Sequence, residues 1–328
     1  MVKSNSLKKV YIGISIIVVL ALMIISLKLG SIEITFKDLI LGLFSGETKG
    51  SIGIIKDLRM PRVLIAALVG GNLALAGVLL QSVIRNPLAD PQVTGISSGA
   101  CLVSLIFIIF IPSSGIMRPI LGFVGGLISC AAVYLISYKK GLDTMRIVLS
   151  GAAINALLGG ISQILTIGSG PSAGNIQSWI SGSLAATSWE EVKILALYSL
   201  VGIGSALVLA KACNVIVLGN KNAKSLGFNA DLYMILITIV AVFLGSVSTS
   251  IVGIIAFVGL VVPHICRILI GSDHKYLIPF SIFVGGALVL LADTLGRMLV
   301  KPYEIPAGIV MAVIGAPFFL YLLRRSDM

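Results

Sequence analysis

Charged residues are scarce in this chain. Asp, Glu, Lys and Arg together make up 11% of its 328 residues, whereas hydrophobic residues make up 57% and the mean hydropathy is +1.09. A soluble domain of this length could not bury so much apolar surface, so the composition predicts an integral membrane protein. The formal net charge is +11, but the basic residues stand at the ends of apolar runs, where they face head groups or partners. Nucleic-acid binding is therefore not predicted.

Residues that support catalysis or metal binding are also few. The four cysteines are widely spaced without a CxxC pair, and neither of the two histidines has a second His or Cys at ligand spacing. No clustered His/Glu or Ser/His/Asp set suggests a membrane enzyme. The glycine-rich stretch GSGPSAG lacks the Gly-Lys-Ser/Thr ending of a phosphate-binding loop, and no GxxxxGK[ST] motif occurs anywhere. The chain itself is not expected to hydrolyse ATP.

Long apolar runs dominate what is present. One crossing of the hydrocarbon core needs roughly 20 helical residues, and the 36 glycines favour closely packed membrane helices over a barrel. The sequence therefore predicts a single all-α membrane domain over residues 1–328 with about ten spans. The predicted spans are 10–29, 61–81, 95–111, 119–138, 145–167, 191–210, 232–252, 254–270, 277–299 and 305–323.

The distribution of basic residues predicts an orientation and leaves an anomaly. Ten spans put both termini on one side, and a modest excess of Lys and Arg on that side predicts that it is cytoplasmic. Arg59, Arg62 and Arg297 then lie on the opposite side. Asp293 stands four residues before Arg297, so the two can pair along one helix face. A neutralised pair at a helix end and a docking role for Arg297 both remain open from this spacing.

A polar run from Lys211 to Asp231 separates the sixth and seventh predicted spans. It contains a short helical patch, Asn222 to Phe228, which ends at Gly227, and glycine commonly ends a helix in a left-handed turn. A compact helical loop transmits a push better than a flexible linker does. We therefore interpret this loop as a surface on which another subunit acts.

Small and polar residues line one face of the fifth predicted span. Asn155, Gly159, Ser162 and Thr166 follow one another at intervals of four, three and four residues. Such a face suits either a packing seam against another helix or the wall of a pore, and the spacing alone does not choose between them.

Several motifs together resemble a known family. They are LRMPRVLIAALVGGNLALAGVLLQ, NPLADPQVTGISSGA, AKSLGFN, GIIAFVGLVVPHICRILIGSDH, LLADTLGR and EIPAGIVMAVIGAPFFLYLLRR. In order and spacing, across nearly the whole chain, they are similar to the permease subunits of ABC importers for ferric siderophores, haem and cobalamin. The resemblance implies the type II importer permease fold in the bacterial cytoplasmic membrane. It also implies a second permease subunit, identical or paralogous, two cytoplasmic ATPases that use ATP and Mg, an extracytoplasmic substrate-binding protein, and no cofactor held by this chain.

The resemblance also implies roles for individual residues. The ATPase-coupling helix matches Ala223, Lys224, Ser225, Leu226 and Gly227. The arginines that meet the binding protein match Arg59, Arg62 and Arg297. The translocation path matches Asn155, Gly159, Ser162 and Thr166, and the inner gate matches Thr144 and Met145.

The implied function is import of a ferric siderophore, with haem and cobalamin as alternatives of the same architecture. An ion- or proton-coupled secondary transporter is the rival class. Such a protein usually carries ionisable residues in the middle of its spans, and the centres of these predicted spans carry none. The sequence therefore favours the ABC permease.

Overall fold

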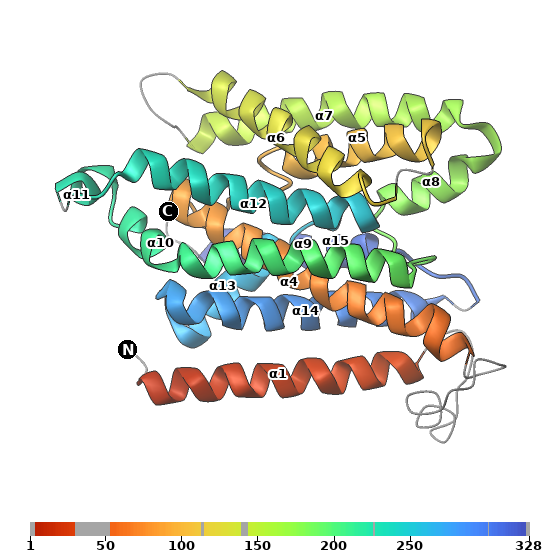
Figure 1. Cartoon of the computed structure of the whole chain (residues 1–328), viewed down its shortest axis with the longest axis horizontal. Coiled ribbons are helices and arrows are strands. Elements are labelled where there is room, and N and C mark those ends of the chain that lie inside the picture. Colours follow the sequence, from red (N-terminus) through yellow and green to blue (C-terminus); the bar gives the residue numbers. More distant parts are fainter. Residues whose placement is uncertain are drawn as a thin grey trace.

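The structure is a computed structural model, and it describes residues 4–29, 53–112, 115–138, 144–225, 227–300 and 302–325. These residues form a bundle of roughly parallel and antiparallel helices (Figure 1). The helices in chain order are α1 (Asn5–Lys28), η1 (Ile54–Arg59), α4 (Met60–Ile84), α5 (Ile96–Phe110), α6 (Arg118–Ser137), α7 (Thr144–Gly168), η2 (Gly170–Ser172), α8 (Ala173–Ile180), α9 (Trp189–Val208), α10 (Ala210–Val217), α11 (Asn220–Ser225), α12 (Ala230–Val252), α13 (Val258–Ile270), α14 (His274–Leu299) and α15 (Ala307–Arg325).

The predicted all-α membrane fold is confirmed. Within the described residues, seven helices are long and apolar enough to cross a membrane, and α5, α13 and α15 are shorter apolar helices. These ten helices match the ten predicted spans in order. The match follows from hydropathy, because a chain must satisfy its backbone hydrogen bonds within each crossing and a helix does so.

Several span boundaries differ from the prediction by a few residues; α1, for example, begins at Asn5 and not at residue 10, and two of these differences have clear local reasons. The second span begins earlier, because the π-helical segment η1 runs directly into α4. The eighth begins later, because residues 253–257 are not helical. Gly253 and Phe257 there have φ angles of +79° and +68°, which an α-helix does not allow.

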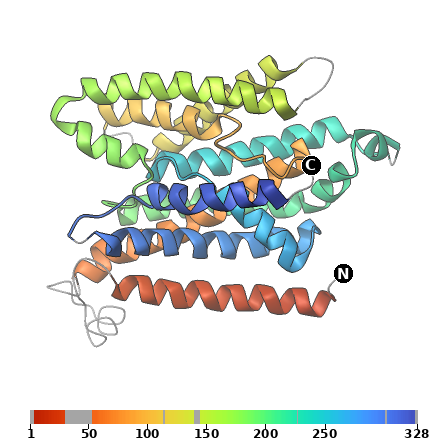
Figure 2. The same ribbon diagram turned by 180° about the vertical axis from the view of Figure 1, so that it is seen from behind.

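Helix α4 forms the centre of the bundle, and 83% of the apolar stretch with which it could cross the membrane is buried. It packs against α14, α12, α13 and α9 (Figures 1 and 2). The approach to α14 is close at Gly70, where an added Cβ would lie 2.2 Å from the Gly285 carbonyl oxygen. Only a residue without a side chain permits this backbone contact.

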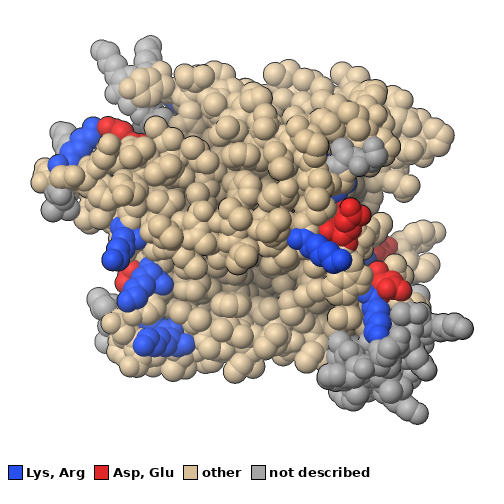
Figure 3. Space-filling view, in the orientation of Figure 1, with Lys and Arg blue, Asp and Glu red and all other residues tan. Residues whose placement is uncertain are grey.

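The two ends of the bundle differ in what they carry. Both chain termini lie at the same end as α11, as the two opposite views agree (Figures 1 and 2). On the face shown in Figure 3, charged side chains gather toward the two ends and leave an uncharged band between them. This band is the surface expected of a membrane-embedded protein.

Candidate functional site

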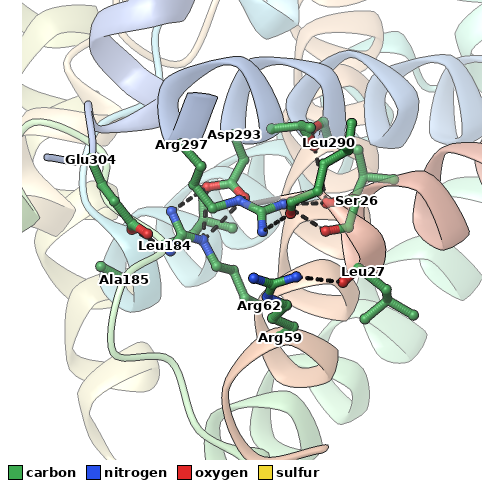
Figure 4. A network of polar contacts seen from close by, with 12 residues as sticks. Ser26, Leu27, Arg59, Arg62, Leu184, Ala185, Leu290, Asp293, Arg297 and Glu304 are labelled. Atoms are coloured by element: carbon green, nitrogen blue, oxygen red, sulfur yellow. Dashed lines mark hydrogen bonds and ion pairs between the residues drawn. The ribbon is translucent and has the colours of Figure 1, made fainter. Parts of the chain in front are cut away.

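The end of the bundle opposite α11 holds a cluster of three arginines and two acids (Figure 4). Arg62 Nη2 lies 2.8 Å from Asp293 Oδ1, and Arg62 Nη1 lies 2.6 Å from Glu304 Oε2. Arg297 Nε lies 3.2 Å from Asp293 Oδ2. Asp293 thus joins α4 to α14, and Glu304 brings in the segment that leads to α15.

The same cluster holds the C-terminal end of α1, whose last carbonyl groups have no partner within the helix. Arg59 Nη1 donates to the carbonyls of Leu27 and Lys28 at 2.9 and 3.0 Å. Arg297 donates to the carbonyls of Leu29 and Ser26 at 2.9 and 3.0 Å. Two cations at a helix C-terminus also face the negative end of the helix dipole.

The cluster, which we call the arginine cluster (Arg59, Arg62, Arg297, Asp293 and Glu304), is largely buried. Arg59 is 6% exposed, Arg297 3% and Asp293 1%. Three positive charges face two negative ones, so the cluster carries one excess positive charge. These arginines therefore act within the subunit as helix caps and ion-pair partners. Direct docking contacts with another protein stay a prediction.

The predicted pair of Asp293 and Arg297 is present, but Asp293 has a second partner that the sequence did not predict. Arg62 contacts this carboxylate with both Nε and Nη2 and lies 231 positions away in the chain. Glu304 also pairs with Arg62. Counting spans would have placed all five charges at one end. Their pairing depends on which helices are neighbours.

At the opposite end, the Lys211–Asp231 loop contains two helices where the sequence predicted one. Helix α10 was missed because Lys211 and Asn214 make the run look polar, whereas Ala212, Cys213 and Ile216 are buried. The expected patch 222–228 is α11, which begins at Asn220 and ends at Ser225. The predicted boundaries of this helix were therefore wrong by two or three residues.

The predicted left-handed end of α11 is confirmed. Gly227 has φ +72°, and its N–H donates to the Lys224 carbonyl at 3.0 Å. The N–H of Phe228 donates to the Ala223 carbonyl at 3.0 Å, which completes a Schellman motif. Ala223 is fully buried, and Lys224 pairs with Asp231 at 2.7 Å on the surface. Leu226, predicted to belong to the same contact surface, lies outside the described residues.

The four residues predicted to line a path on α7 have different surroundings. Asn155 donates to the Gln92 carbonyl at 2.7 Å, in the segment between α4 and α5. Ser162 and Thr166 are buried and donate to carbonyls one turn earlier in their own helix. Gly159 is exposed, and no atom lies within 4 Å of its ideal Cβ position. The predicted face of α7 thus includes Asn155, which contacts another segment, and Gly159, which is exposed and has no neighbour at its Cβ position.

The predicted inner gate lies at the start of α7. Thr144 is its first residue, and the Met145 side chain is 66% exposed. The described contacts do not assign a role to this pair. No group of three or more His, Cys, Asp or Glu that could hold a metal occurs in the part of the chain that the structure describes.

In the part of the chain that the structure describes, seven helices of spanning length and three shorter apolar ones form a bundle with a compact helical loop at one end and a buried charge cluster at the other, which is the architecture of a membrane transport subunit. The comparisons give the family: the chain belongs to the FecCD transport family, whose model matches residues 17–325. It is a permease subunit of an ABC importer and not an enzyme. As a family member, it acts in the cytoplasmic membrane together with a permease partner.

Two relatives show how much of the chain the likeness covers. The Fe(3+)-citrate import system permease protein YfmD of Bacillus subtilis is 39% identical over 92% of this chain and 90% of its own length. The haem-iron transport system permease protein IsdF of Staphylococcus aureus is 38% identical over 98% of this chain and 97% of its own length. The two are equally similar to this chain, although their names give different cargoes.

Solved structures agree on the fold. An inward-facing conformation of a metal-chelate type ABC transporter matches with a TM-score of 0.80 at 28% identity and covers 97% of this chain and 100% of its own. PsaBC from Streptococcus pneumoniae matches with a TM-score of 0.59 at 22% identity over 84% of this chain and 94% of its own, which supports the fold alone.

Proposed function

We propose that this permease forms the translocation path for a ferric siderophore. An extracytoplasmic binding protein delivers the substrate at the arginine-cluster end, and two cytoplasmic ATPases act on α11 at the other end. The observation that carries this proposal is the arrangement of the two ends. The Schellman-closed helix α11 lies at the same end of the bundle as both chain termini, and the arginine cluster lies at the other end (Figures 1 and 4).

Haem is the second candidate substrate, because a relative as similar as the ferric-citrate permease is named for haem iron. Cobalamin is the third candidate substrate, because permeases for it share the same architecture. The path would follow the face of α7 that carries Gly159, with Thr144 and Met145 at its inner end. The second permease copy, identical or paralogous, would form the opposite wall.

The test is uptake by the complete importer reconstituted in liposomes. With the ATPases and a ferric-siderophore binding protein, labelled siderophore should accumulate only when ATP is supplied on the α11 side. Accumulation that follows an ion gradient without ATP would contradict the ABC mechanism. ATP-dependent uptake of haem but not of siderophore would leave the mechanism standing and change the substrate.

The burial of the arginine cluster predicts how docking would work. Its excess positive charge would act on an acidic partner through the electrostatic field, which extends about 8 Å at physiological ionic strength. Replacing Arg59 by glutamine should therefore slow association of the binding protein several-fold and weaken its dependence on salt, because steering mainly sets the association rate.

The matched control for this prediction is Arg59→Lys, which keeps the charge and changes the shape. It should associate at close to the original rate. Association rates measured at several salt concentrations distinguish the two variants. If Arg59→Gln associates with the original rate and salt dependence, the arginine cluster does not steer docking.

A further inference from the structure

The motif GSDH at residues 271–274 has no role in the function proposed so far. It joins α13 to α14, whose first residue is His274. Asp273 is the N-cap of α14: its Oδ1 accepts from the Lys275 N–H at 3.0 Å. The same oxygen accepts from the Asn214 side-chain amide at 2.9 Å. Asn214 belongs to α10, so one carboxylate oxygen both caps α14 and holds α10 against it.

His274 completes the contact from the other side of the amide. Its backbone N–H donates to Asn214 Oδ1 at 2.9 Å, and its Nδ1 lies 2.7 Å from the same oxygen. A carboxylate only accepts hydrogen bonds, so the Asn214 NH₂ must face Asp273 and its oxygen must face His274. The imidazole therefore carries a proton on Nδ1, and its side chain is buried with the residue 2% exposed.

These groups form a polar joint between α10 and α14. Burial raises the pKa of the Asp273 carboxyl, but the hydrogen bonds from Asn214 and Lys275 and the nearby Lys8 and His274 together hold it below its usual value. Each hydrogen bond to an ionised group contributes more than a neutral one does. The Lys8 ammonium of α1 lies 4.9 Å from the centre of the neighbouring Tyr276 ring. The starts of α1 and α14 thus meet beside α10.

The position of the joint suggests its purpose. Only Leu218 and Gly219 separate α10 from α11, the helix proposed to contact the ATPase. Helix α14 is 26 residues long, which corresponds to about 39 Å at 1.5 Å per residue. Its far end carries Asp293 and Arg297 of the arginine cluster. One continuous helix therefore connects the neighbourhood of α11 with the proposed docking end.

We infer that Asn214, Asp273 and His274 form a clamp that transmits movement of α11 to α14. This inference rests on the proposed role of α11, and it makes the three residues positioning residues for coupling. Through the clamp, a displacement of α11 would shift α14 as a unit, in addition to the covalent routes through α9 and α12. The far end of α14 would then move relative to its contacts with α4 and α1.

The chemistry of the clamp allows a charge-exchange test in the complete importer. Asn214→Asp places a second carboxylate against Asp273 and should separate α10 from α14. We expect at least a tenfold loss of uptake while ATP hydrolysis continues. Asp273→Asn keeps an acceptor for both the cap and Asn214, so it should stay within twofold of the original protein. The double variant Asn214→Asp with Asp273→Asn can turn the new amide at position 273 so that its NH₂ faces the new carboxylate, but it then loses the cap to the Lys275 N–H, so it should recover part of the uptake that Asn214→Asp loses.

The outcomes separate the clamp from general damage and from the proposed function. Full uptake by Asn214→Asp, or an assembled double variant that recovers nothing, would overturn the clamp. If Asn214→Asp does not assemble, Asn214→Ala removes the joint without adding charge. This variant should also lose uptake while ATP hydrolysis continues, and full uptake by it would overturn the clamp. Failure of the unmodified importer to couple uptake to ATP would instead overturn the proposed function.

Discussion

Replacing Gly227 by valine should lower uptake by roughly tenfold while the partner ATPases continue to hydrolyse ATP. Gly227 has φ +72° and closes α11 through the hydrogen bonds at its own N–H and that of Phe228. An L-residue in this conformation costs roughly 1–2 kcal/mol, and a β-branched side chain adds to that. Because 1.4 kcal/mol is a factor of ten, the equilibrium between the closed and the open end of α11 would shift roughly tenfold toward the open end. Uptake and hydrolysis measured on the same liposomes give the coupling ratio.

Two control variants test whether the loss of coupling comes from the left-handed turn at Gly227 or from any strained valine in the chain. Gly227→Asn keeps a residue that tolerates the left-handed conformation and should couple almost normally. Gly170→Val makes a comparable change at φ +59°, also with no atom within 4 Å of the ideal Cβ, but at the opposite end of the bundle. Equal loss of coupling in Gly170→Val would show that strain anywhere harms transport and would remove the special role of Gly227.

The difference between what sequence reasoning found and what it missed has a physical basis. Span number and order depend on local hydropathy, so all ten helices were predictable. The left-handed turn at Gly227, two residues after α11 ends, was predictable too, because glycine in such a turn is a local preference. The pair Asp293–Arg297 lies within one helix and follows from spacing.

Contacts between distant helices were not predictable in the same way. Arg62 and Asp293 are 231 residues apart, and nothing local to either says that α4 and α14 are neighbours. The clamp has the same character, because Asn214 in α10 and Asp273 before α14 are 59 residues apart and only the fold brings them together. The α7 face was predicted as a unit, yet tertiary contacts divide it into buried Ser162 and exposed Gly159.

Replacing Asp293 by asparagine should destabilise the subunit more than any other single charge change in the arginine cluster. The substitution keeps the shape of the side chain and removes the carboxylate that Arg62 and Arg297 share. Asp293 is 1% exposed, so the guanidinium groups would remain buried without their common partner. Breaking a buried ion pair from one side typically costs about 3–5 kcal/mol. The unfolding transition of the purified subunit in detergent should fall accordingly.

The control is Glu191→Gln at the same end of the bundle. Glu191 pairs with Arg118 at 2.7 Å, but the two side chains are 22% and 17% exposed, so water still reaches both and this pair should contribute less than the fully buried one. Glutamine also keeps the capping box that Glu191 forms with Ser188. If Asp293→Asn unfolds no more easily than Glu191→Gln, the buried cluster does not stabilise the subunit.

A second substitution tests whether unbalanced charge is the cause. In the Asp293→Asn background, Arg297→Met removes one of the cations left without its carboxylate and fills much of the same volume. It also removes the donors to the Ser26 and Leu29 carbonyls, so recovery should be partial. The double-mutant cycle should give an interaction energy of roughly 1–3 kcal/mol between the two sites. Strict additivity would mean that Arg297 stabilises the fold only through the carbonyls at the end of α1.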